Sequence, residues 1–132
     1  MLHNDWTHIE QLAKILRPFK EQTDVMQTNT MALSNIIPTL LELNQTLKDT
    51  SLNESVVQTL ENSISQRFSC FLDPLSPSFD PIPAAACLLD PSVVICMLRD
   101  DTKTLLGEAR SYITRTVLIL HVCHKVRHFI IT

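Results

Sequence analysis

The chain has 132 residues and a net charge of −3, and 45% of its residues are hydrophobic against 19% charged. This length and composition predict one folded domain with a single core, and they exclude disorder over most of the chain. The negative charge balance gives no general basis for binding nucleic acid or an anionic membrane, and the single glycine excludes glycine-rich phosphate-binding loops.

Cysteine spacing and hydropathy exclude several further kinds of site and segment. The four cysteines form no C-x-x-C pair, so neither a zinc ribbon nor a redox motif of that kind is predicted. The chain begins without the basic and apolar regions of a signal peptide, and no window of about 18 residues is apolar throughout. We therefore expect reduced thiols in the cytosol or nucleus, and no membrane partner.

The first predicted helix follows Asn4 or Asp5, either of which can accept hydrogen bonds from the first helical N–H groups. Behind them lies an apolar row at helical spacing, with a second row that widens the same face (Trp6, Ile9, Ala13 and Leu16; Leu12, Ile15 and Phe19). Because Pro18 lacks an N–H and clashes with the preceding turn, the helix either stops near Leu16 or kinks there and resumes to about Gln27.

Two further helices are predicted before the proline-rich part of the chain. One runs from about Thr30 to Lys48, with Pro38 inside it as an expected bend. Ser51 and Glu54 have the spacing of a capping box, which marks the start of the next helix. That helix carries an apolar stripe made of Val57, Leu60, Ile64, Phe68 and Phe71.

The segment from Asp73 to Pro83 contains four prolines and is predicted to be a surface loop. The run Ala84–Leu89 is small and apolar, which is typical of a buried helical turn that closely approaches neighbouring backbones. Asp100 or Asp101 can cap a final helix, whose apolar residues are Leu105, Leu106, Ala109 and Ile113.

The pattern changes after Ile113. Residues 117–120 are apolar on every side, and the following HVCHKVRH interleaves basic residues with cysteine and valine. No single helical face can accommodate this order, so the tail is predicted either to be buried all round or not to pack in this fold. The chain contains no acidic residue from Arg110 onward, and its basic residues there are Arg110, Arg115, Lys125 and Arg127.

Two sets of side chains could bind a metal ion, but a structural role is favoured for both. His121, His124 and His128 share one face if the tail is helical, and Cys123 lies beside them; zinc binding competes with the simpler reading of a basic helix end. The second set could hold Mg²⁺, but its members precede prolines or occupy helix caps (Asp73, Asp80, Asp90, Asp100 and Asp101). We predict no catalytic residue, metal, cofactor or small-molecule substrate.

Several stretches carry a resemblance to a known family, in this order: Trp6 to Leu16-Arg17-Pro18-Phe19, Lys20 to Thr23 and Met26, Ile37-Pro38, Leu60 to Phe68, and Ala84 to Pro91. Together they resemble the hAT superfamily of transposases and the BED zinc-finger proteins derived from it, and the last looks like the family signature "aaaLLDPrfK". The likeness covers about residues 5–113. It departs after Pro91, where Ser92-Val93-Val94 replaces a basic and aromatic continuation.

In that family the matching region is an all-helical insertion within a ribonuclease-H-like catalytic core. The family's metal-binding aspartates, catalytic glutamate, dimerisation segment and zinc finger lie outside it. The resemblance therefore implies a fragment of a transposase-derived protein that lacks the machinery for cutting and joining DNA. It also implies a nuclear location and a parent protein that binds DNA and regulates transcription; without the resemblance, a cytoplasmic location is expected.

These observations predict an all-α fold, an irregular bundle of about four to five helices with a proline-rich loop, as a fragment of a larger ribonuclease-H-like transposase fold. Residues 1–113 would form the hAT-like helical domain and residues 114–132 a divergent tail. The expected function is a non-enzymatic scaffold or protein-interaction module that contacts a partner through exposed apolar faces. The alternative is a nucleic-acid-binding module that uses the basic tail, and DNA would be a partner in the full-length parent.

Overall fold

The computed structural model describes residues 2–28 and 32–131, and within these ranges it contains helices but no strand. The all-α prediction is confirmed. The described part has six α-helices where about four to five were expected, because Ser69–Leu72 forms a separate single turn. The elements are α1 Leu2–Met26, η1 Leu33–Asn35, α2 Ile36–Lys48, α3 Glu54–Arg67, α4 Ser69–Leu72, α5 Ile82–Leu89, η2 Val94–Leu98, η3 Asp100–Thr102 and α6 Lys103–Ile131, where η denotes a 3₁₀ helix.

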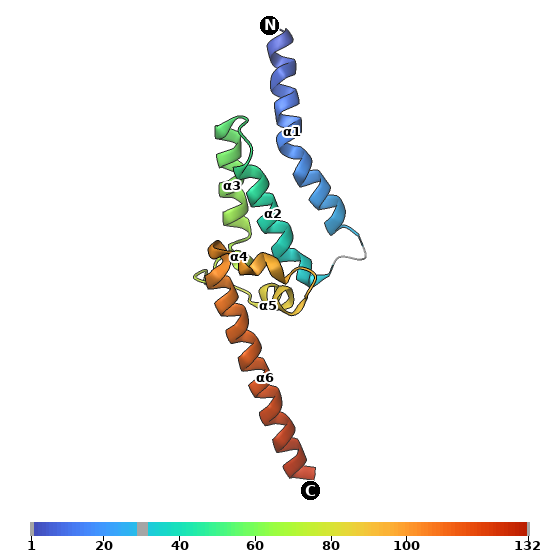
Figure 1. Cartoon of the computed structure of the whole chain (residues 1–132), viewed down its shortest axis with the longest axis vertical. Coiled ribbons are helices and arrows are strands. Elements are labelled where there is room, and N and C mark those ends of the chain that lie inside the picture. Colours follow the sequence, from blue (N-terminus) through green and yellow to red (C-terminus); the bar gives the residue numbers. More distant parts are fainter. Residues whose placement is uncertain (1, 29–31, 132) are drawn as a thin grey trace.

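The helices form a body from which two of them project (Figure 1). α2 lies at the centre of this body, and it contacts α1, α3 and α5. The N-terminal half of α1 extends from one end of the body, and the C-terminal half of α6 extends from the opposite end. The N-terminal end of α1 and the C-terminal end of α6 are therefore far from the packed residues.

One apolar cluster lies between α1, α2 and α3. Its buried members are Ile15, Leu43, Leu47, Val57 and Ile64, and Phe19, Leu60 and Phe68 pack against it half-buried. The predicted stripe on the third helix is confirmed for Val57 and Ile64. On α1, the expected row through Trp6, Ile9 and Leu16 is wrong as a core face: those side chains are exposed, and the neighbouring row with Ile15 packs instead.

A second cluster lies between the start of α2, α5, η2 and the start of α6. Its buried members are Ile37, Ala84, Cys87, Met97, Leu105 and Ala109. The prediction that Ala84–Leu89 forms a buried helical turn is confirmed for Ala84, Ala85 and Cys87, although Leu89 is exposed. The expected single core is wrong, because α2 is apolar on two sides and contributes to two separate clusters.

Prolines affect the helices less than the sequence indicated. α1 continues through Pro18 to Met26, so the alternative in which the helix resumes beyond the proline is the correct one. Pro38 is the third residue of α2, in the first turn, where a missing N–H removes no intrahelical hydrogen bond. Pro38 therefore does not interrupt the hydrogen bonds of α2, which was the reason for predicting a bend there. The predicted start of this helix at Thr30 lies outside the described residues.

Three predicted helix ends differ from the observed ones. α3 is capped by Asn53, which has a left-handed backbone (φ 43°) and accepts a hydrogen bond from the Val56 N–H at 3.4 Å, so the Ser51–Glu54 capping box is wrong. The surface loop ends at Pro81, because Pro83 is buried in the first turn of α5. Helical structure already begins at Asp100 in η3, so the two aspartates do not cap α6 in the way expected.

Asp90 ends α5 and connects it to η1. Its carboxylate accepts a hydrogen bond from the buried Ser34 hydroxyl at 2.6 Å, and others from the Ser92 hydroxyl at 2.6 Å and the Ser92 N–H at 2.9 Å. These donors, above all Ser34, lower the pKa of Asp90 below its ordinary value. The ionised carboxylate is therefore the form that the folded chain stabilises.

This geometry makes the stability of the chain depend on pH in a defined direction. A lowered folded pKa adds stability above the ordinary aspartate pKa of about 3.9, and that stability is lost as the pH falls through the folded value. We expect Asp90→Asn to be less stable than the unsubstituted chain at pH 7, with a difference that disappears at acid pH. Urea unfolding of both chains between pH 7 and pH 2.5 measures this. A difference that stays constant over the range would contradict it.

Candidate protein-interaction surface

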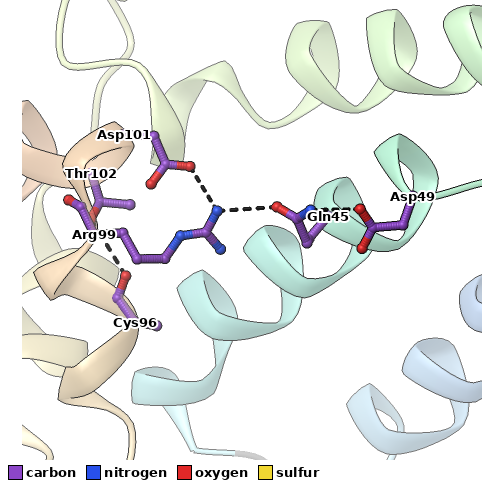
Figure 2. Close-up of polar contacts among 6 residues, drawn as sticks. All are labelled: Gln45, Asp49, Cys96, Arg99, Asp101 and Thr102. Atoms are coloured by element: carbon purple, nitrogen blue, oxygen red, sulfur yellow. Dashed lines mark hydrogen bonds and ion pairs between the residues drawn. The ribbon is translucent and has the colours of Figure 1, made fainter.

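The start of α6 is positioned by a group of polar contacts around Arg99 (Figure 2). The Arg99 guanidinium donates to the Gln45 side-chain oxygen on α2 at 3.1 Å and to the Asp101 carboxylate at 3.0 Å. The Gln45 amide in turn donates to Asp49 at 2.9 Å. Because these side chains are largely exposed, each contact contributes little stability. Their effect is to orient the corner between η2 and η3 against α2.

Buried groups fix the same corner more firmly. Thr102 immediately precedes α6, and its buried hydroxyl donates to the Arg99 carbonyl at 3.0 Å and to the Cys96 carbonyl at 3.4 Å, as Figure 2 shows in part. Leu105 and Ala109 on the first turns of α6 then enter the second cluster. The direction in which α6 leaves the body therefore follows from packed residues.

α6 continues without interruption past the predicted domain boundary at Ile113. Tyr112, Ile113 and Thr116 are half-buried, and every described side chain from Val117 to Ile131 is exposed. Of the two predictions for the tail, burial all round is wrong. From Val117 to Ile131 the described part of the tail is therefore a projecting helix with exposed side chains.

In the helical tail, most aliphatic side chains lie on one side and the histidines lie on the other. At about 100° per residue, five aliphatic side chains fall within about 120° of one another; we call them the α6 apolar arc, which consists of Leu118, Ile119, Val122, Val126 and Ile130. His121, His124 and His128 lie on the opposite side, as the sequence predicted for a helical tail. The arc holds only part of the apolar residues of the tail, which agrees with the expectation that no single helical face accommodates all of them. Val117, Leu120 and Ile131 lie outside the arc, and they obscure it in the sequence.

The four basic residues predicted to contact nucleic acid all lie exposed on α6, at different angles around it. By the same helical geometry, Lys125 and Arg127 flank the apolar arc on its two sides, and Arg115 lies in line with the arc, towards the body. Arg110 lies on the histidine side, a turn closer to the second cluster. The arc is thus an apolar strip with basic residues around it.

The other candidate residues have structural partners or lie apart. Asp73 and Asp80 accept hydrogen bonds from backbone N–H groups two residues ahead, and Asp100 pairs with Lys103 at 2.7 Å. Among the described residues, no group of three or more histidine, cysteine or acidic side chains is arranged to hold a metal ion. The depression beside His124 and His128 is formed by side chains of one helix, so it cannot enclose a ligand.

Comparisons with known proteins identify no family or relative for the chain. No protein-family model, no curated protein and no solved structure matches the chain. Within residues 2–28 and 32–131, even the longest helix, α6, lacks the sustained apolar stretch that a bilayer crossing requires.

Proposed function

We propose that this chain is a non-catalytic helical module that binds a partner protein, and that the partner contributes an acidic amphipathic helix to the α6 apolar arc. The observation that supports this most directly is the exposure of the arc on a helix whose base is firmly packed. Contiguous exposed apolar side chains of this kind are typical of protein-interaction sites. A helix packed against the arc would use anchors at helical spacing on both partners.

The energetics of the projecting helix favour a bound state. Isolated helices of about 15 residues are marginal in water, and β-branched residues such as Val122 and Val126 lower helix propensity further. The distal half of α6 gains no stability from packing against the body. Burying an aliphatic side chain contributes about 1.5–3 kcal/mol, so a partner that covers the arc would stabilise this helix as well as the complex.

Charge selects the type of partner. The arc is flanked by Lys125 and Arg127, and no acidic residue follows Glu108 in the chain. Acidic side chains beside the apolar face of a partner helix would pair with these cations. A second copy of the chain would instead bring the same cations together, which is unfavourable. Lys125 and Arg127 beside the arc thus favour a different protein as the partner over a second copy of the chain.

The resemblance to hAT transposases supports the wider part of the proposal. The signature-like stretch from Ala84 to Pro91 forms most of α5 and the turn after it, and its small residues pack in the second cluster. In this proposal the chain derives from the helical insertion of a ribonuclease-H-like transposase. It acts in the nucleus as a scaffold within a DNA-binding regulatory protein, and it carries no catalytic centre of its own.

Two valines provide a matched test of the arc. Val122 lies in the arc and Val117 lies on the histidine side, and both side chains are 57% exposed. The probe is a fluorescent helical peptide with leucines on one face and glutamates beside them. We expect Val122→Glu to weaken its binding by about 30-fold, because a carboxylate would enter an apolar interface beside acidic groups. Val117→Glu should change the affinity by less than about threefold.

The competing explanations predict different results in three binding and association measurements. A peptide with lysines in place of glutamates should bind poorly; equal binding of both peptides would contradict the charge argument. Dimerisation of the chain alone, measured by analytical ultracentrifugation and lost in Val122→Glu, would assign the arc to a second copy. Binding to anionic lipid vesicles that is stronger than binding to the peptide would assign it to a membrane surface.

Nucleic-acid binding is a second candidate function, because all four basic residues are exposed on one helix without acidic neighbours beyond Glu108. Their spread around the helix makes a shared contact with one duplex less favourable. The logarithm of the affinity for duplex DNA falls linearly with the logarithm of the salt concentration. If Lys125 and Arg127 each contact a phosphate, changing both to alanine should make the slope of this plot shallower by about two. An unchanged slope would exclude phosphate contacts by Lys125 and Arg127.

A further inference from the structure

Two cysteines from different elements meet inside the second cluster. Cys87 is buried on α5 and Cys96 is half-buried in η2, and their sulfur atoms lie 3.4 Å apart. Both thiols are free. A disulfide bond is about 2.05 Å long, so the two sulfurs need to approach by only about 1.4 Å to form one.

The backbone between the two cysteines holds them in this position. The Asp90 N–H donates to the Cys87 carbonyl at 3.3 Å, and the N–H groups of Val93 and Val94 donate to the Asp90 carbonyl at 3.2 and 3.0 Å. The Cys87 thiol also contacts the Val93 carbonyl, with 3.9 Å between the two atoms. The carboxylate of Asp90 is itself held by Ser34 from η1. The proximity of the sulfurs is therefore built into a hydrogen-bonded turn.

We infer that Cys87 and Cys96 are a modification site, a dithiol that a hydroperoxide converts into one intramolecular disulfide. In the first step the Cys96 sulfur attacks the peroxide O–O bond, giving a sulfenic acid on Cys96 and releasing water or an alcohol. In the second step the Cys87 sulfur attacks the Cys96 sulfur, the S–O bond breaks, and the oxygen leaves as water with the Cys87 proton. Two thiols lose two electrons in total, and the peroxide gains them.

The surroundings of the two thiols determine this order of steps. Cys96 is the more accessible of the two, so it meets the oxidant first. Burial, followed by the hydrogen bond with Cys96, raises the pKa of Cys87 to about 12. The raised pKa disfavours Cys87 as the first nucleophile, whereas the 3.4 Å between the two sulfur atoms places it in position to attack the Cys96 sulfenic acid.

The disulfide would act on the support of α6. It would link η2 to α5 covalently, and η2 leads directly into the corner where the Cys96 carbonyl accepts the Thr102 hydroxyl before α6 begins. Cross-links of this kind chiefly restrict the unfolded chain. Oxidation would thus stabilise the body and the base of the projecting helix.

The test uses the full chain with hydrogen peroxide as oxidant. Mass spectrometry should show the loss of two hydrogens, about 2 Da, with peptide mapping that joins Cys87 to Cys96. Two of the four thiols should no longer react with an alkylating reagent. The urea midpoint of unfolding should rise, and a dithiol reductant should restore both the midpoint and the mass.

Variants separate the paired thiols from the others. Changing both Cys70 and Cys123 to serine should leave the disulfide yield unchanged. Cys96→Ser should abolish the disulfide, and Cys87→Ser should instead accumulate a sulfenic acid on Cys96 that a cyclic diketone traps. Cys87→Ala serves in its place if the serine variant does not fold. Oxidation that yields only dimers through Cys123, or only sulfinic acid on Cys96, would overturn the inference.

Discussion

Replacing Ile37 by alanine is expected to lower the free energy of unfolding by about 2–5 kcal/mol, the largest effect on stability that we predict for a single substitution. Ile37 is fully buried, at 0% exposure, and it belongs to the cluster in which α2 meets α5 and α6. The substitution removes three carbon atoms from a packed site and leaves a cavity. Since small domains have a total stability of about 5–15 kcal/mol, this loss would be a large fraction of the whole.

Ile119 provides the matched control for this prediction. The same substitution there removes the same atoms from a side chain that is 62% exposed on the projecting part of α6. Its effect should stay within about 0.5 kcal/mol, because surface substitutions rarely exceed that range and alanine is the better helix former. Urea unfolding measures both variants. A loss for Ile119→Ala as large as that for Ile37→Ala would mean that distal α6 packs in solution.

The elements that were predicted correctly are those in which local pattern and burial agree. The stripe on α3 recurs at helical spacing, and Ala84 and Cys87 can be packed closely because they are small, so both segments could be recognised from sequence. On α1 the pattern was ambiguous. Apolar residues occupy two adjacent rows, and the choice of Ile15 over Leu16 as the packed residue depends on where α2 lies.

The errors at helix ends have a different origin. The effect of a proline depends on the distance to the helix start, so Pro38 could not be interpreted until η1 placed that start at Ile36. The cap of α3 required a left-handed backbone at Asn53, which residue spacing alone does not reveal. Both features are decided by the conformation of a few residues before the helix.

The candidate surface and the cysteine pair were missed for geometric reasons. The arc around Val122 became visible only once the tail was known to be one helix, because Leu120 and Ile131 break the pattern in the linear sequence. Cys87 and Cys96 fit no recognised cysteine spacing, and the turn at Asp90 is what brings their sulfurs together. Two features of the sequence indicate the pairing of Cys87 and Cys96: a turn-forming Asp-Pro-Ser follows the short helix that carries Cys87, and a second cysteine comes soon after it.

Removing the distal part of α6 is expected to have the largest effect on binding. A chain that ends at Thr116 keeps Leu105, Ala109 and every half-buried residue of α6 but loses the whole apolar arc. We expect its affinity for the acidic helical peptide to fall by more than about 100-fold, since all five aliphatic anchors and both flanking cations are lost. Fluorescence anisotropy measures this against the full-length chain.

The same truncation tests whether the body folds without residues 117–132. Because Val117 and the residues after it make no packed contact with the body, the urea midpoint should remain nearly unchanged, while the far-ultraviolet helical signal falls in proportion to the helix removed. A chain that ends at Leu106 is the control, because it loses Ala109 from the second cluster and should unfold far more easily. Collapse of the Thr116 truncation would show that distal α6 stabilises the body. Retained peptide binding would place the interaction surface outside distal α6.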